Sequence, residues 1–209
     1  MPSNNIIIFD LWQTLADTTF KPSDLFEDLL HMNKTIIKKD FFEKLFKSDL
    51  YTKDISLEKG LSGLLSDLGI LNRENLKKAI VSWKEMSQKN FLIEGAETLL
   101  INLKTRGYKL CLLTNIDKYG YENFPYKNLL TNFDYKFLSY SEGLRKPDKK
   151  CWEVIKNYYK VGYEDMVMIG DSMENDIFPA KQLKLSTVLI DVNNKKNVYN
   201  DVYINFLNS

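Results

Sequence analysis

Histidine and cysteine are scarce in this chain of 209 residues, which contains one histidine, His31, and two cysteines, Cys111 and Cys151. A metal site built on histidines and a Ser-His catalytic triad are therefore nearly excluded. The two cysteines form no CxxC pair and have no nearby histidine in the sequence. We expect both to be buried free thiols in a reducing compartment.

The sequence also lacks an excess of either charge, because 29 Lys and Arg residues balance 28 Asp and Glu residues. No broad basic surface is implied, so we expect no nucleic-acid partner. No apolar run is long enough to span a membrane, and the N-terminal run is too short for a signal peptide. We expect a cytoplasmic protein without a membrane partner, and the sequence indicates no oligomeric state.

Two apolar runs that each lead directly into an aspartate are the strongest positive signal. Ile6 to Phe9 precede Asp10, and Met166 to Gly170 precede Asp171. Runs that are apolar at every position are typical of central parallel strands, and ligands bind beyond the carboxyl ends of such strands. Either aspartate alone is explained equally well by a simple turn. Two of them, expected at the same edge of one sheet, favour a functional site.

A regular alternation of strands and helices from Glu94 onward predicts an α/β fold with a doubly wound parallel sheet. We expect strands near residues 5–9, 108–113, 134–138, 166–170 and 187–190, with a possible short one at 202–206. Helices are expected at 96–106, 147–160 and 175–183. The segment 119–131 is ambiguous because Pro125 interrupts any long helix.

The interval between the first strand and this alternation contains no convincing strand. It favours four short amphipathic helices, beginning near Pro22, before Phe41, after Ser56 and after Asn72. We therefore expect a helical subdomain at 17–90 inserted into a core formed by 1–16 and 91–209. The alternative is that these helices belong to a single α/β domain.

Four motifs in chain order resemble those of the haloacid dehalogenase-like (HAD) hydrolases. They are Phe9-Asp10-Leu11-Trp12-Gln13-Thr14-Leu15, Leu112-Leu113-Thr114-Asn115, Gly143-Leu144-Arg145-Lys146-Pro147-Asp148 and Ile169-Gly170-Asp171-Ser172-Met173-Glu174-Asn175-Asp176. Each is weak alone, but together they cover essentially the whole chain. The resemblance implies a Rossmann-like core with a helical cap inserted after the first motif.

The resemblance also implies a hydrolase that acts on a small phosphorylated metabolite. Asp10 would be the nucleophile, since a carboxylate can attack phosphorus and form an aspartyl-phosphate. That attack joins two anions, so a cation is needed, and Mg2+ prefers oxygen ligands. Asp10, the backbone carbonyl of Trp12, Asp171 and Asp176 would form its site. Asp176 is also explained as an acid that favours the N-terminus of a helix.

The remaining motif residues would bind the phosphate. Lys146 would be the catalytic positive charge on the transferring group and on Asp10. Thr114 would offer its hydroxyl and backbone N–H, Asn115 its amide, and Leu11 and Trp12 their backbone N–H groups. Thr114 as an ordinary cap and Asn115 as a residue that tolerates an unusual backbone angle are the alternatives.

Trp12 departs from the family pattern, because most phosphatases of the family carry a second aspartate at this position. That acid protonates the leaving oxygen and then activates water, which indole cannot do. Family dehalogenases carry an aromatic residue here, use no metal and displace halide from carbon. The first hypothesis is a Mg2+-dependent phosphohydrolase, because Asp171 and Asp176 would have little purpose otherwise. The alternatives are a metal-independent 2-haloacid dehalogenase and a low-activity or non-catalytic phosphate-binding relative.

Overall fold

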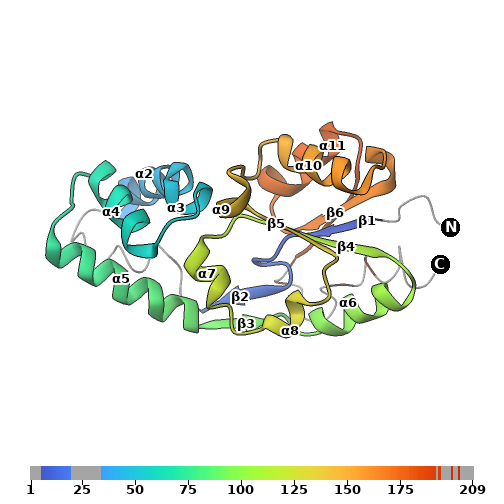
Figure 1. Cartoon of the computed structure of the whole chain (residues 1–209), viewed down its shortest axis with the longest axis horizontal. Coiled ribbons are helices and arrows are strands. Elements are labelled where there is room, and N and C mark those ends of the chain that lie inside the picture. Colours follow the sequence, from blue (N-terminus) through green and yellow to red (C-terminus); the bar gives the residue numbers. More distant parts are fainter. Residues whose placement is uncertain (1–5, 20–33, 192, 194–198, 200–201, 203–209) are drawn as a thin grey trace.

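A five-stranded parallel sheet forms the centre of the molecule (Figure 1). The computed structural model of the chain describes residues 6–19 and 34–191, together with residues 193, 199 and 202. The strand order is β5-β4-β1-β6-β7. The strands are β1 (Ile6–Phe9), β4 (Lys109–Thr114), β5 (Tyr135–Leu138), β6 (Met166–Gly170) and β7 (Ser186–Leu189). The chain winds outward from β1 in both directions, which confirms the predicted doubly wound sheet.

Helices cover both faces of this sheet, which explains why β1 is apolar at every position. Ile7 and Phe9 pack on the face covered by α6 (Ala96–Thr105), whereas Ile6 and Ile8 pack on the opposite face. Two helices cover that second face, α10 (Lys150–Tyr159) and α11 (Phe178–Gln182). Both cysteines are buried free thiols, as expected.

Several short helices connect these elements. They are α7 (Lys118–Glu122), α8 (Lys127–Leu130), α9 (Ser139–Glu142), the 3-10 helix η1 (Tyr163–Asp165) and the π-helix η2 (Met173–Ile177). The ambiguous segment 119–131 is thus two short helices on either side of Pro125. The predicted helix at 147–160 begins only at Lys150, and the one predicted at 175–183 is a π-helix followed by α11.

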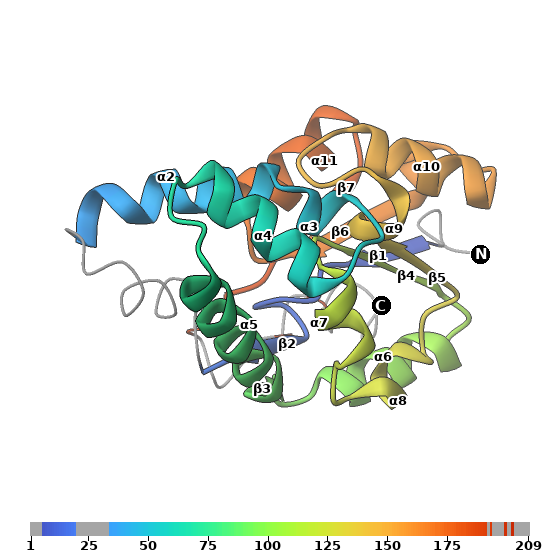
Figure 2. The ribbon, with the colours of Figure 1, turned by 60° about the vertical axis from the view of Figure 1, so that its left-hand side comes forward.

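A separate group of helices lies to one side of the sheet (Figures 1 and 2). It consists of α2 (Lys34–Lys47), α3 (Asp49–Thr52), α4 (Leu57–Asp67) and α5 (Arg73–Gln88). Their apolar sides form a hydrophobic cluster of their own, which includes Leu45, Leu61 and Trp83. The predicted caps are present, since Ser56 accepts from the Lys59 N–H and Asn72 from the Asn75 N–H. The helix expected near Pro22 lies outside the described residues.

The expectation that residues 17–90 contain no strand was wrong at both ends of this interval. β2 (Ala16–Thr18) and β3 (Asn90–Leu92) pair as a two-stranded antiparallel sheet. Each strand has only three residues and its partner is distant in the sequence, so neither shows a hydrophobic period. The pairing brings the two connections between the helical group and the sheet side by side.

The described residues contain no helix that is long and apolar enough to cross a membrane. The possible strand at 202–206 lies outside the described part of the chain except for Val202, which is not in a strand.

Candidate active site

Asp10 lies at the carboxyl end of β1, the strand from which the strand order runs outward in both directions. It follows β1 directly, and its backbone N–H donates to the carbonyl of Ile169 in β6 at 2.9 Å. The Leu11 carbonyl then accepts from the N–H groups of Leu15 and Ala16, both at 2.9 Å. These bonds fold the chain into a tight loop that holds Asp10 beside the end of β6, where ligands bind in doubly wound sheets.

Three carboxylates meet at this edge of the sheet. One oxygen each from Asp10, Asp171 and Asp176 lie within 4.8 Å of one another. Asp10 and Asp176 are buried, and Asp171 is half-buried. Gly170 makes this approach possible, because a Cβ atom at this position would clash with the carboxylate of Asp176. The residues predicted as acidic metal ligands are therefore brought together, although Asp176 lies in a π-helix instead of an ordinary helix start.

Lys146 inserts its ammonium group between two of these acids. Its Nζ lies 2.6 Å from Oδ1 of Asp10 and 2.6 Å from Oδ1 of Asp176, and the side chain is buried. Asn115 fixes the backbone on either side, since its Oδ1 accepts from the Lys146 N–H at 2.9 Å and its Nδ2 donates to the Lys146 carbonyl at 3.0 Å. The second oxygen of Asp176 accepts from the Ser172 N–H at 3.1 Å.

The electrostatics of the cluster favour an additional cation. Burial raises the pKa of the Asp10 carboxyl well above its usual range, and Asp176 and Asp171 raise it further, although Lys146 opposes them. Burial, followed by the charge of Asp176, raises the pKa of Asp171 to about 6. Burial by itself would lower the pKa of Lys146, but Asp10 and Asp176 raise it. Three acids with one ammonium leave excess negative charge, and a divalent ion bound by oxygen ligands fits such a donor set.

The residues predicted to bind phosphate lie at the ends of β1 and β4, which are neighbouring strands. Trp12 and Asn115 line the cavity beside the carboxylates, whereas Leu11 and Thr114 are not among its lining residues. Thr114 ends β4, is fully buried, and its hydroxyl has no hydrogen-bond partner among the described residues. The backbone N–H groups of Leu11 and Trp12 likewise donate to no backbone carbonyl within the described ranges. An unpaired buried donor such as the Thr114 hydroxyl is unusual and is explained by a ligand that accepts from it. Asn115 differs, because both ends of its amide are occupied by Lys146.

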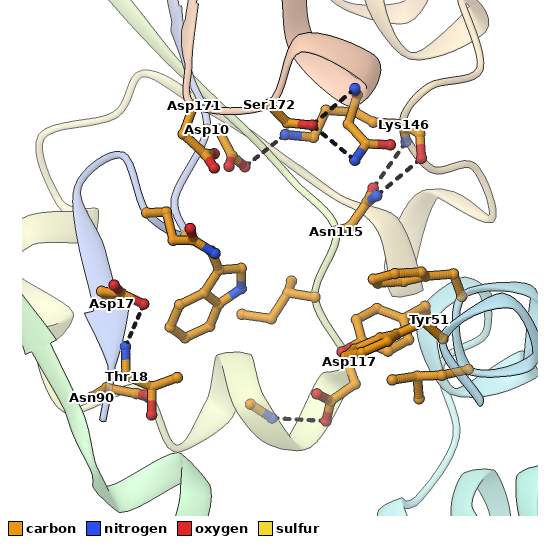
Figure 3. A pocket seen from close by; sticks show the side chains of 18 of the residues that line it. Asp10, Asp17, Thr18, Tyr51, Asn90, Asn115, Asp117, Lys146, Asp171 and Ser172 are labelled. Atoms are coloured by element: carbon orange, nitrogen blue, oxygen red, sulfur yellow. Dashed lines mark hydrogen bonds and ion pairs between the residues drawn. The ribbon is translucent and has the colours of Figure 1, made fainter. Parts of the chain in front are cut away.

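A cavity of about 580 Å³ opens from the carboxylates toward the helical group (Figure 3). Asp10, Lys146, Asp171 and Asp176 line one end of it. Trp12 lies along its wall, where the indole is half-buried and meets the Phe124 ring edge-on at a centroid distance of 6.0 Å.

Two further acids line the cavity that the sequence did not assign to the site. Asp17 lies in β2, and its carboxylate accepts a hydrogen bond from the Thr18 N–H at 2.8 Å. The charge of Asp17 contributes to the raised pKa of Asp171. Asp117 caps α7 through the Gly120 N–H at 2.9 Å, and burial raises its pKa to about 6. Asp117 follows Thr114 by three residues, so its nearness to the second motif was the available signal.

These features define an α/β protein with a buried acid and lysine cluster at the switch point of its sheet. The family model of the haloacid dehalogenase-like hydrolases matches residues 5–184. The chain belongs to the haloacid dehalogenase-like hydrolase family.

A curated relative and two solved structures illustrate the similarity. A glyceraldehyde 3-phosphate phosphatase from Pyrococcus abyssi is 28% identical over 97 residues, which is 46% of this chain and 41% of that protein. The match thus spans about two-fifths of the length of that relative. A HAD-family enzyme from Bacteroides thetaiotaomicron in complex with magnesium and inorganic phosphate has a TM-score of 0.65 at 18% identity, with 90% of this chain and 94% of that chain covered. The L-2-haloacid dehalogenase of Xanthobacter autotrophicus has a TM-score of 0.58 at 14% identity, covering 89% and 77%.

Proposed function

We propose that this protein is a Mg2+-dependent phosphohydrolase that acts through an aspartyl-phosphate on Asp10. The observation that carries the proposal is the cluster in which the carboxylates of Asp10, Asp171 and Asp176 meet within 4.8 Å. A metal-independent dehalogenase needs no such set of acids. Its substrate carries no phosphoryl group whose negative charge a metal ion would have to neutralise. The magnesium and phosphate bound by the Bacteroides enzyme of similar fold are consistent with this choice.

The acidic residues of the cluster and Lys146 would have different roles. Asp10, Asp171 and the backbone carbonyl of Trp12 would hold the metal, with Asp176 acting through a bound water. When bound, Mg2+ supplies the positive charge that allows the Asp10 carboxylate to approach an anionic phosphate. Lys146 holds one Asp10 oxygen at 2.6 Å and so orients the other oxygen for attack.

The hydrogen-bond donors that lack an acceptor would bind the phosphate. The Thr114 hydroxyl and the N–H groups of Leu11 and Trp12 would donate to phosphate oxygens. Asn115 was expected to contact the substrate, but its two hydrogen bonds to Lys146 favour a positioning role. In the first step the bond from Asp10 to phosphorus forms and the ester bond breaks. In the second, water attacks phosphorus, which releases phosphate and restores the carboxylate.

We also propose that the helical group acts as a cap, with residues 17–90 as the cap and residues 1–16 and 91–209 as the core. The separate hydrophobic cluster of these helices supports the division. So does the cavity, which is lined by residues from both parts. The pairing of β2 with β3 places both crossings between the two parts at one point.

The test measures phosphate released from phenyl phosphate in the presence of Mg2+ and again with EDTA. We expect release only with Mg2+, and loss of activity in the Asp10→Asn and Asp171→Ala variants with the circular dichroism spectrum unchanged. Full activity of Asp171→Ala would contradict the metal assignment. Halide release from a 2-haloacid in EDTA would show a dehalogenase instead, and absence of both reactions would indicate a binding protein.

A further inference from the structure

Apolar and aromatic side chains form part of the lining of the cavity. Phe42, Leu45, Phe46, Tyr51, Met86 and Ile116 line it. Five of the six come from α2, α3 and α5, and Ile116 comes from the loop after β4. Figure 3 shows Tyr51 on the side of the cavity away from Asp10 and Asp171. A phosphate bound at the acids would therefore direct the remainder of its ester toward these rings.

Phe42 and Tyr51 pack against the hydrophobic cluster of the helical group and also line the cavity. Phe42 and Phe46 stack with centroids 5.9 Å apart and an interplanar angle of 23°, and Phe46 meets Tyr51 edge-on at 5.9 Å. Phe46 remains 37% exposed although it belongs to this aromatic row. Aromatic pairs prefer such offset or edge contacts, so a further ring can add to the row in the same way.

The charge of the lining, as far as the described residues form it, disfavours a second anionic group on the substrate. Lys146 is the one cation among the described residues that line the cavity. Its ammonium group already forms ion pairs with Asp10 and Asp176. Arg145 contacts the Phe46 ring, 5.9 Å from its centre, but does not line the cavity. Asp17 and Asp117 add negative charge beyond the three clustered acids. A carboxylate or second phosphate on the ester would face these acids unpaired, which costs several kcal/mol in general.

The chemistry at position 12 leads to the same class of molecule. Trp12 cannot protonate a leaving oxygen, and an alkoxide leaves poorly without a proton. An aryl oxide is a far weaker base and departs as the anion. The bond between Asp10 and phosphorus forms, the bond between phosphorus and the aryl oxygen breaks with its electron pair on that oxygen, and water later supplies the proton.

We infer that the substrate is a phosphate monoester of an uncharged aromatic alcohol, an inference that rests on the proposed phosphohydrolase function. The aromatic row selects the ring, the acidic lining disfavours a second anion, and Trp12 restricts turnover to good leaving groups. A triose phosphate, the substrate in the name of the Pyrococcus relative, offers neither a ring nor an acidic leaving oxygen.

The experiment compares kcat and KM for phenyl phosphate, 4-carboxyphenyl phosphate and glycerol 3-phosphate, all with Mg2+. We expect kcat/KM for phenyl phosphate to exceed that for glycerol 3-phosphate by about 100-fold, the scale of a missing acid. The added carboxylate should raise KM at least about tenfold. Equal turnover of the phenyl and carboxyphenyl esters, or of the phenyl and glycerol esters, would overturn the inference.

Variants of one exposed aromatic residue localise the effect. Phe46→Ala should raise KM for phenyl phosphate about five- to tenfold, from the loss of a ring contact, without changing KM for glycerol 3-phosphate. Phe46→Lys should lower KM for the carboxyphenyl ester. Tyr158→Ala is the matched control, because Tyr158 is 54% exposed on α10 and does not line the cavity. Equal effects of Phe46→Ala on all three esters would contradict the assignment.

A binding measurement separates this inference from the proposed function. Calorimetry with phenylphosphonate and 4-carboxyphenylphosphonate, which are not hydrolysed, reports the preference without turnover. Tighter binding of phenylphosphonate by about tenfold supports the aromatic site even if no ester is hydrolysed. Equal affinity refutes it even if phosphate release is efficient.

Discussion

Lys146 neutralises part of the negative charge of the site, because its ammonium group contacts two buried carboxylates at 2.6 Å. Replacing it by methionine keeps most of its volume but leaves Asp10 and Asp176 without their cation. Removing one partner of a buried ion pair typically costs about 3–5 kcal/mol. We therefore expect Lys146→Met to lower the free energy of unfolding by that amount at pH 8 and to abolish phosphate release.

Urea unfolding at pH 8 and pH 5 measures this effect. The loss should shrink at pH 5, because the raised pKa of Asp10 allows protonation to remove part of the unpaired charge. Lys149→Met serves as the control, since Lys149 is exposed and lies three residues away. Equal stability of the two variants would show that the pair contributes nothing.

Trp12 is the residue at which this chain departs from the pattern of the phosphatases in its family. Trp12→Asp would place a carboxylic acid beside the leaving oxygen. We expect kcat for an alkyl phosphate to rise by up to about 100-fold, the lower end of general acid–base catalysis, with a smaller gain for an aryl phosphate. The indole also lines the cavity, so kcat must be measured separately from KM. A gain of the same size for both esters would argue against a missing acid.

At the scale of single elements, α7 begins at a buried acid whose charge opposes folding. Asp117 caps α7, and burial raises its pKa from 3.8 to about 6. The folded protein therefore binds more protons than the unfolded chain between these values, so stability falls as pH rises through this window. Asp117→Asn keeps an acceptor for the Gly120 N–H and removes the charge. We expect the variant to gain up to roughly 3 kcal/mol over the wild type between pH 4 and pH 7.

Urea unfolding of both proteins at pH 4, 5, 6 and 7 gives the difference in free energy directly. The two curves should converge near pH 4 and separate above pH 6. Asp54→Asn provides the control, because Asp54 is exposed and pairs with Lys118 at the surface. Parallel curves for Asp117→Asn and the wild type would show that Asp117 carries no burial penalty.

The elements differ in how far the sequence predicts them, and the reasons are physical. Strands buried on both faces, such as β1 and β6, leave apolar runs that end in an aspartate, and both were predicted within one residue. Caps such as Ser56 and Asn72 act locally and were predicted as well. The pair β2 and β3 depends on contact between two three-residue segments far apart in the chain, which no local pattern records.

The same distinction applies to the site. Asp10, Asp171, Asp176 and Lys146 occur in motifs at strand ends, and the structure brings them together. The aromatic row of the cavity arises from helices whose apolar residues have ordinary helical spacing. Phe42 and Phe46 have the spacing of an ordinary amphipathic helix in the sequence, and only the packing of the helices places them in the lining of the cavity.

At the scale of the whole molecule, the cavity lies between the helical group and the sheet. The helical group and the sheet each bury their own apolar residues. Described contacts between them include the exposed ion pair of Asp54 with Lys118 and the approach of Arg145 to Phe46. Exposed pairs contribute only about 0–1 kcal/mol. Tyr119 of α7 also packs against the hydrophobic cluster of the helical group, so apolar contacts hold the two parts together as well.

If the carboxylate cluster binds metal as proposed, metal binding should be coupled to the stability of the whole fold. Without metal, burial and the charge of Asp176 raise the pKa of Asp171 to about 6. Its ionised form therefore destabilises the folded protein above pH 6, and this penalty disappears as the pH falls toward 3.8. Asp171→Asn should consequently be more stable than the wild type by about 1–3 kcal/mol at pH 8 in EDTA, and equally stable near pH 4.

Mg2+ should reverse that order. An ion that binds only the folded state stabilises it by about 2.7 kcal/mol at 100 times its dissociation constant. We expect this gain in the wild type at pH 8, and little of it in Asp171→Asn, which lacks one anionic ligand. Urea unfolding of both proteins in EDTA and in a Mg2+ series gives all four free energies, and Asp148→Asn, an exposed acid outside the cluster, should respond to Mg2+ as the wild type does. An equal response of Asp171→Asn would mean that the metal binds elsewhere. A wild type that is already more stable than Asp171→Asn in EDTA would mean that the three acids do not repel one another.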